Sequence, residues 1–182
     1  ELGFLRDVQY PYVVPRLKRL EVLLISWGAR AEENARRAKD DLFGIQNSRK
    51  VYDGRQAGLF SPAIMEPKAA AEATFRRQVA SRPEGRDVEA AYGRIAEAVA
   101  TQRRIYARYR QLEGGHAFAS DSFGLARSLL RAGDELPKPN GERLREFGDA
   151  RRESFELQLF SAKPIHTDCE TVMLTEALTI LA

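Results

Sequence analysis

Residues Glu32 to Leu59 read EENARRAKDDLFGIQNSRKVYDGRQAGL. The residue pattern of this stretch is helical, and no proline interrupts it. Ser61-Pro62 follows almost at once, and a capping residue before a proline at the first helical position ends one helix and begins another. The stretch therefore predicts one long helix with a second helix directly after it.

The rest of the chain is also helical in pattern, with no sustained alternation of apolar and polar residues that would indicate strands. Short loops between the helices require antiparallel neighbours. We therefore expect an all-α fold, an antiparallel up-and-down bundle of about seven helices, two of them long, forming a single domain over residues 1–182. The six other helices are expected at about Val13–Trp27, Pro62–Val79, Asp87–Leu112, Ser122–Arg131, Gly141–Phe160 and Thr167–Leu181.

Several helix ends carry recognisable signals. Ser120 or Asp121 is expected to cap the fifth helix, Asn140 the sixth and Thr167 the seventh, because their side-chain oxygens can accept the first backbone N–H groups. Gly114-Gly115 is expected to end the second long helix, that of Asp87–Leu112.

Composition excludes several functional classes. The 182 residues are 43% hydrophobic and 30% charged, which is typical of a globular protein rather than a disordered one. The net charge of +3 is too small for a dedicated nucleic-acid binder. One cysteine and two histidines leave no disulfide and no histidine-rich metal cage, so we expect no metal and no cofactor. The longest apolar run, Val22 to Ile25, is too short to span a membrane.

One sequence neighbourhood could be nucleophilic. Cys169 lies near His166, between Asp168 and Glu170, at the expected start of the last helix. A histidine beside a thiol can activate it. We favour the simpler interpretation of a first helical turn whose acidic residues suit the helix dipole. His116 beside Gly114-Gly115 is likewise interpreted as part of a helix end rather than as a catalytic group.

Basic and aromatic residues gather on the second long helix, where a nucleic acid could contact arginine and stack on tyrosine. These arginines are spread around the helix rather than along one face. Elsewhere basic and acidic residues alternate at helical spacing, so we favour a solvated, ion-paired surface and expect no nucleic-acid partner. The group comprises Arg103, Arg104, Arg108, Arg110, Tyr106 and Tyr109, and the spaced pairs are Glu32–Arg36, Glu33–Arg37 and Glu72–Arg76.

The first long helix carries an unusual stripe. Five of its residues, which we call the glycine stripe, fall within an arc of about 80° on a helical wheel. Each interior glycine costs about 1 kcal/mol relative to alanine, so three on one face need a reason. Either a neighbouring backbone packs there, or the stripe lines a cleft in which Asn47 contacts a ligand. The stripe comprises Gly44, Asn47, Val51, Gly54 and Gly58.

Two blocks around these residues resemble a known family. Residues 40–50 read DDLFGIQNSRK and are followed by Gly54 and Gly58, and residues 153–161 read ESFELQLFS and are followed by Pro164-Ile165. Both blocks are similar to the helical domain of bacterial dipeptidyl-peptidases of the 7 and 11 type, and the resemblance extends over most of the chain.

The resemblance implies a serine peptidase that releases dipeptides from peptides with a free N-terminus. In this family an all-helical domain is inserted into a chymotrypsin-like β-barrel domain that holds the His-Asp-Ser triad. The helical domain caps the cleft, and one of its asparagines binds the substrate's N-terminal amine. The motif position places that role on Asn47. The implied partners are the peptide substrate, the β-barrel domain of the parent chain and a second copy in a homodimer, in the periplasm or outside the cell.

The sequence departs from the whole-enzyme pattern, because it has neither a Gly-Asn-Ser-Gly nucleophile segment nor barrel strands. We therefore expect an excised cap domain that is inactive by itself. The first specificity pocket belongs to the barrel, so acidic or hydrophobic preference cannot be predicted from this segment. The alternative is a stand-alone helical module that binds another protein through the same stripe.

Overall fold

The computed structural model describes residues 2–113 and 120–181, and the described residues form helices, turns and loops without a strand. The predicted all-α class is confirmed. His116 and the predicted helix end at Gly114-Gly115 lie outside the described residues. The chain divides into two compact units, residues 1–114 and residues 115–182, which are described separately.

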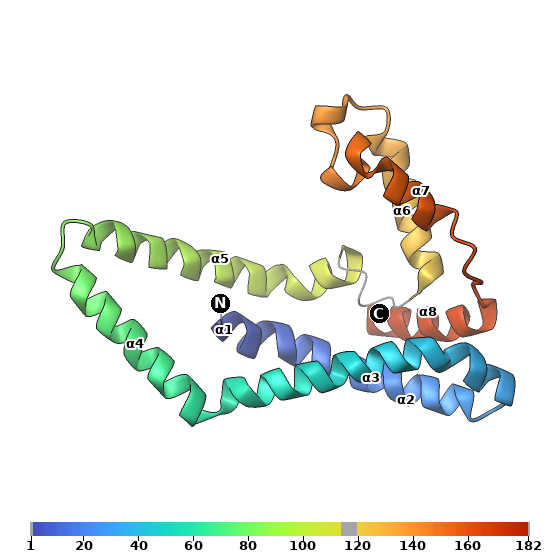
Figure 1. Ribbon diagram of the computed structural model, residues 1–182, viewed down its shortest axis with the longest axis horizontal. Coiled ribbons are helices and arrows are strands. Elements are labelled where there is room, and N and C mark those ends of the chain that lie inside the picture. Colours follow the sequence, from blue (N-terminus) through green and yellow to red (C-terminus); the bar gives the residue numbers. More distant parts are fainter. Residues whose placement is uncertain (1, 114–119, 182) are drawn as a thin grey trace. The chain divides into compact units, whose positions relative to one another are not determined.

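The first unit contains the long helices (Figure 1). The two longest helices, α3 and α5, are close to the ranges expected from the sequence. The elements of this unit are α1 (Leu2–Phe4), η1 (Leu5–Gln9), α2 (Tyr10–Gly28), α3 (Glu32–Phe60), α4 (Pro62–Ala80) and α5 (Gly85–Leu112).

The N-terminal helical segment begins earlier than the predicted Val13. Residues from Leu2 onward are already helical, and η1 is a π-helical turn that ends two residues before Pro11. Proline has no N–H to donate, and its ring crowds the carbonyl four residues earlier. A wider π-helical turn relieves that crowding. Pro15 lies inside α2 rather than in a first turn, and Pro67 lies inside α4, which begins at Pro62.

Helices α2 and α3 form an antiparallel pair joined by a short turn. Ala38 and Ile45 are the buried residues of α3. The helices approach closely near the turn, since a Cβ on Gly28 would lie 3.3 Å from the Ala35 Cα. The amide of Asn34 donates to the Trp27 carbonyl at 3.2 Å, and this carbonyl at the end of α2 also accepts the Arg30 N–H at 3.2 Å.

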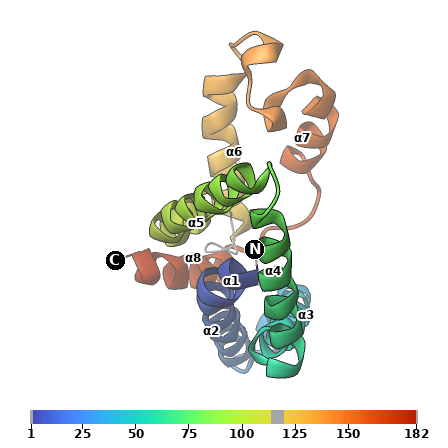
Figure 2. The ribbon, with the colours of Figure 1, turned by 90° about the vertical axis from the view of Figure 1, so that its left-hand side faces the viewer.

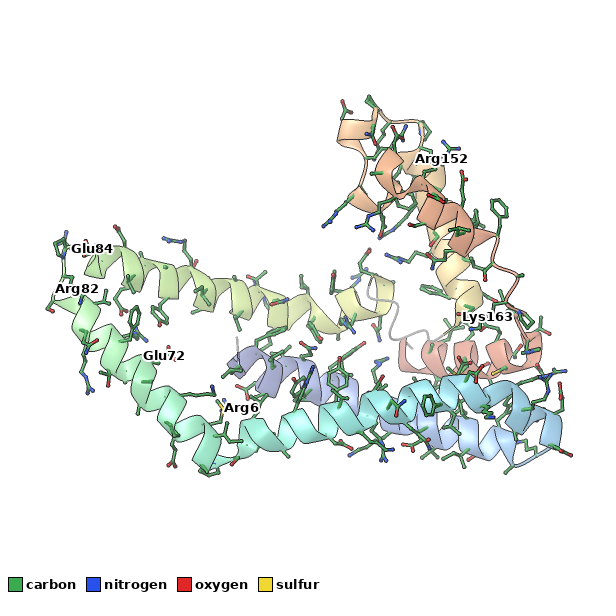
Figure 3. All side chains as sticks on the ribbon, viewed as in Figure 1. Arg6, Glu72, Arg82, Glu84, Arg152 and Lys163 are labelled. Atoms are coloured by element: carbon green, nitrogen blue, oxygen red, sulfur yellow. The ribbon has the colours of Figure 1, made fainter. Side chains whose placement is uncertain are left out.

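Helix α4 diverges from α3, and α5 then runs back toward the N-terminal segment (Figures 1 and 2). The turn between α4 and α5, where Arg82 and Glu84 are labelled in Figure 3, ends at the buried Gly85. Arg76 of α4 binds Glu89 of α5 through two contacts of 2.6 and 3.0 Å. The same guanidinium lies 4.5 Å above the Tyr92 ring, so one side chain links both helices.

Aromatic side chains connect α5 to the N-terminal segment. The Tyr106 ring packs edge-on against Phe4 and Tyr12, with centroid distances of 5.4 and 5.5 Å. The Tyr12 hydroxyl donates to the Ala107 carbonyl at 3.3 Å. These contacts attach the far end of α5 to the start of the chain, and they bury Tyr106 to 6% exposure.

The second unit begins its described part with α6, and its helices are shorter. Ser120 caps α6 as predicted, because its hydroxyl accepts the Phe123 N–H at 3.1 Å. Helix α6 continues past the predicted end at Arg131. The elements are α6 (Asp121–Glu135), the 3-10 turns η2 (Asn140–Glu142), η3 (Arg145–Phe147) and η4 (Asp149–Arg151), α7 (Arg152–Leu159) and α8 (Thr167–Leu181).

The predicted sixth helix over Gly141–Phe160 is wrong in its first half, and so is the predicted cap at Asn140. Three 3-10 turns replace that half, and the α-helix begins only at Arg152. The Asn140 amide oxygen accepts the Asp149 N–H at 2.8 Å instead of capping a helix.

Side-chain contacts to the backbone explain the difference. The Glu135 carboxylate accepts the Leu144 N–H at 2.7 Å, and Arg143 donates to the Lys138 and Leu136 carbonyls at 2.8 and 3.1 Å. These bonds fold the segment back onto the end of α6, where Phe147 is buried at 5% exposure. A continuous helix would have to give up all of them.

Candidate functional site on helix α3

The glycine stripe lies on the exposed side of α3. Asn47, Gly44, Val51 and Gly54 are all exposed. Within the described residues, no heavy atom beyond the local helix backbone lies within 4 Å of a Cβ built on Gly44 or Gly54, and one on Gly58 would meet only Ile64 at 3.8 Å. The close helix contact that a packing explanation requires is therefore not found among the described residues of the first unit.

The opposite side of α3 faces α2. At 100° per residue, Ala38 and Ile45 lie about 180° and 160° around the helix from Asn47. Both are buried, with exposures of 1% and 9%. The helix therefore presents its apolar residues to α2 and its glycines and Asn47 outward.

Apolar side chains flank Asn47 on the outer side. Phe43, one turn before it, is 66% exposed, and Val51, one turn after it, is 49% exposed. An amide bordered by glycines and exposed apolar groups can accept a hydrogen bond from an ammonium and leave room for an extended backbone beside it.

One polar contact behind the site was not predicted from the sequence. Glu21 of α2 accepts a hydrogen bond from the Gln46 amide at 3.1 Å and forms an ion pair of 2.9 Å with the Arg49 Nε. Gln46 and Arg49 are neighbours of Asn47 in sequence but point toward α2. The only sequence signal for this contact would have been an acidic residue on the preceding helix opposite polar residues of α3. That pattern is too common to identify a specific contact.

The N-terminal turns of α3 carry intrahelical ion pairs. The Glu33–Arg37 pair is confirmed at 2.8 Å, whereas Arg36 donates to Glu33 rather than to the expected Glu32. These two arginines lower the pKa of Glu33 to about 2. Arg76, expected to pair with Glu72, binds Glu89 instead.

The Cys169 neighbourhood is used structurally in the second unit. Cys169 is buried at 6% exposure. The Glu170 carboxylate accepts the Ser120 hydroxyl at 2.6 Å and the backbone N–H groups of Asp121 and Ser122 at 3.0 Å each. Helix α8 begins at Thr167, with the Glu170 N–H bound to the His166 carbonyl, so the cap lies one residue before the predicted Thr167. Glu170 thus holds the N-terminus of α6, which supports the structural interpretation.

A pocket of about 230 Å³ lies beside this α6 cap. Lys163, labelled in Figure 3, follows α7 and forms an ion pair of 3.0 Å with Asp121 at the pocket wall. Gln158 and Ser161, from the second family-like block, also line it. The pocket contains none of the glycine-stripe residues.

The arginine cluster on α5 does not form one binding surface with its tyrosines. Tyr106 is buried against Phe4 and Tyr12, so it is not accessible to a stacking base, whereas Tyr109 is 50% exposed. Arg104 donates to Thr101 on its own helix at 3.3 Å.

The described residues offer neither a metal site nor a membrane-spanning helix. The described residues include no group of three histidine, cysteine or acidic side chains placed to bind a metal. None of the described helices combines the length and the apolar character needed to cross a membrane.

Comparison with known proteins identifies the family. No curated protein and no solved structure matches the chain. A family model described as Peptidase S46 matches residues 1–182. This is the dipeptidyl-peptidase 7 and 11 family indicated by the two sequence blocks, whose members are serine dipeptidyl peptidases. Because the match covers the whole chain, the protein belongs to the peptidase S46 family.

Proposed function

We propose that this chain is the substrate-capping helical part of a serine dipeptidyl peptidase, and that Asn47 binds the N-terminal ammonium of the peptide. In this proposal residues 1–182 act together as one cap domain on a β-barrel catalytic domain of the same parent chain. The barrel supplies the triad, and the cap segment by itself is inactive. The parent enzyme is a periplasmic or secreted homodimer.

One observation carries the proposal. Asn47 is exposed on the outer side of α3, and the stripe glycines Gly44 and Gly54 leave open space on the same side. An asparagine held there has its amide oxygen available to a ligand, whereas a packing asparagine would be covered by another helix. Family membership makes a peptide with a free N-terminus the expected ligand.

The chemistry of such a site is recognition rather than bond cleavage. A dipeptidyl peptidase cleaves after the second residue from a free N-terminal amine. It therefore needs a hydrogen-bond acceptor for that amine at a fixed distance from its nucleophile. A neutral amide oxygen accepts an ammonium N–H without placing a second charge in the cleft. Orientation of the substrate by this contact would contribute to the rate by holding the scissile bond in a reactive position.

The test is Asn47→Ala in the full-length parent enzyme. A hydrogen bond to a charged group is worth about 1.5–3 kcal/mol, so kcat/KM for a free-amine dipeptidyl substrate should fall about ten- to 150-fold. The melting temperature should hardly change, because the side chain is exposed. An N-acetylated analogue, which lacks the ammonium, should lose no further activity in the variant.

Asn34→Ala is the matched control. Asn34 is on the same helix, but its amide donates to the Trp27 carbonyl at the α2–α3 turn. This variant should lower the melting temperature and leave kcat/KM near the wild-type value. Wild-type kcat/KM in Asn47→Ala, or a loss that only follows a large fall in melting temperature, would contradict the proposed role.

A further inference from the structure

We propose that Glu21 is a positioning residue that fixes the rotation of α3 about its own axis and thereby aims Asn47 at the substrate. The inference rests on the proposed function of Asn47. Glu21 is on α2 and is not part of the glycine stripe, and it acts through α3 rather than by touching the peptide.

The contacts of Glu21 form a two-point clamp. Its Oε1 accepts a hydrogen bond from the Gln46 Nε2 at 3.1 Å. Its Oε2 forms an ion pair with the Arg49 Nε at 2.9 Å, without a hydrogen bond. The Glu21 side chain is only 13% exposed, and that of Arg49 is 33% exposed. A carboxylate that holds two side chains three residues apart on one helix restricts both the rotation and the sliding of that helix.

The apolar contacts of α3 with α2 include the Tyr52 ring, which packs edge-on against the buried Tyr10 with a centroid distance of 5.4 Å. Among the described residues of α3 only Ala38 and Ile45 are buried, although the helix runs from Glu32 to Phe60. Apolar packing is nondirectional, so two buried residues fix the helix rotation only loosely. The outer side adds no restraint from the described residues of the first unit, since none of them meets a Cβ built on Gly44 or Gly54.

The two residues held by Glu21 lie on the same turn of α3 as Asn47. Gln46 immediately precedes Asn47, and Arg49 follows it by two residues, about 100° and 160° away around the axis. Side chains reach about 5 Å from a helix axis, so a rotation of about 15° would move the Asn47 amide by about 1.3 Å. Misplacement of about 1 Å in a positioned contact can reduce a rate about a hundredfold.

A second link on the same flank is weaker. Lys18 lies 3.8 Å from Asp53, and the side chains are 55% and 40% exposed. An exposed ion pair at that distance contributes little, because water screens it and two long side chains must be ordered. The Tyr10–Tyr52 contact lies more than one helical turn from Asn47, so Glu21 is the polar contact whose loss should most loosen the rotation of α3 at Asn47.

A double-mutant cycle in the full-length parent enzyme tests the inference, with Glu21→Ala, Asn47→Ala and the double variant. If Glu21 acts through Asn47, Glu21→Ala lowers kcat/KM about three- to thirtyfold in the Asn47 background. In the Asn47→Ala background, Glu21→Ala should lower kcat/KM by less than about twofold. A change of that size is the usual deviation from additivity between two substitutions. Glu21→Gln, which keeps an acceptor for Gln46, should lose less activity than Glu21→Ala.

Glu33→Ala is the matched control, because Glu33 is a glutamate of α3 whose ion pairs stay within that helix. It should leave kcat/KM within about twofold of wild type. Equal losses from Glu21→Ala in both backgrounds would show general damage and overturn the inference, as would no loss in the Asn47 background.

The two proposals fail in distinguishable ways. Loss of activity in Asn47→Ala together with wild-type activity in Glu21→Ala would overturn the clamp and leave the amine site intact. Wild-type activity in Asn47→Ala would overturn the amine site, and the role of Glu21 would be rejected with it.

Discussion

Gly44→Ala separates the two reasons for placing glycine on the outer side of α3. Gly44 is well inside the helix, where glycine costs about 1 kcal/mol relative to alanine. A Cβ built there meets no heavy atom within 4 Å among the described residues beyond the local helix backbone. The substitution should therefore stabilise the chain by about 1 kcal/mol and raise Tm by about 2–4 °C for a protein of this size.

Activity should change in the opposite direction. Residues three apart on a helix have Cβ atoms about 5–6 Å from each other, so the new methyl group would stand beside Asn47. A peptide backbone bound to the Asn47 amide would meet that methyl group, and overpacking typically costs about 1–3 kcal/mol. We expect kcat/KM of the full-length enzyme for a dipeptidyl substrate to fall about five- to 150-fold while Tm rises.

Gly93→Ala is the matched control for this prediction. Gly93 is also exposed inside a long helix, α5, and a Cβ there also meets nothing within 4 Å among the described residues. It should raise Tm by a similar amount and leave kcat/KM unchanged. Raised stability with unchanged activity in Gly44→Ala would refute passage of the substrate along the stripe. A lowered Tm would show that another part of the parent protein packs against Gly44.

Two further predictions concern stability. In Gly85→Ala the new Cβ would lie 2.7 Å from the Val79 carbonyl oxygen. We therefore expect a destabilisation of about 1–3 kcal/mol, measured as a lower urea midpoint of unfolding. An unchanged midpoint would contradict the tight α4–α5 turn. Burial disfavours the ionised Glu170, but hydrogen bonds from Ser120, Ser122 and Asp121 outweigh it and lower its pKa below the ordinary 4.5. The stability from this lowered pKa is present above about pH 4.5 and is lost as the pH falls through the folded-state pKa. The urea midpoint of Glu170→Gln should therefore be lower than that of the wild type at pH 7, and the two midpoints should converge toward pH 3. A constant difference across that range would refute this role of the carboxylate.

The sequence predicted most helix positions because local signals specify them. Ser61-Pro62 separates α3 from α4 as expected, and Ser120 caps α6. These signals act within a few residues, through backbone N–H satisfaction and the fixed φ of proline. Local patterns could not predict the three 3-10 turns after Asn140, because the competing bonds come from Glu135 and Arg143 and form only when the segment folds back.

The candidate site was predicted in part. The spacing of Gly44, Asn47 and Gly54 placed them on one side of a helix, since helical periodicity alone fixes angular position. That spacing left open whether the side was covered. Only the three-dimensional arrangement answers this for the described residues, because α2 packs against Ala38 and Ile45 and leaves the glycines open.

Periodicity, capping and motif identity are properties of neighbouring residues, so the all-α class, the two long helices and the family could be predicted without a structure. The burial of Tyr106 against Phe4 and Tyr12, and the contacts of Glu21 with Gln46 and Arg49, became visible only in three dimensions. These contacts join residues far apart in the chain. Their formation depends on how helices pack, and packing follows from the shapes and charges of both partners, which no local pattern contains.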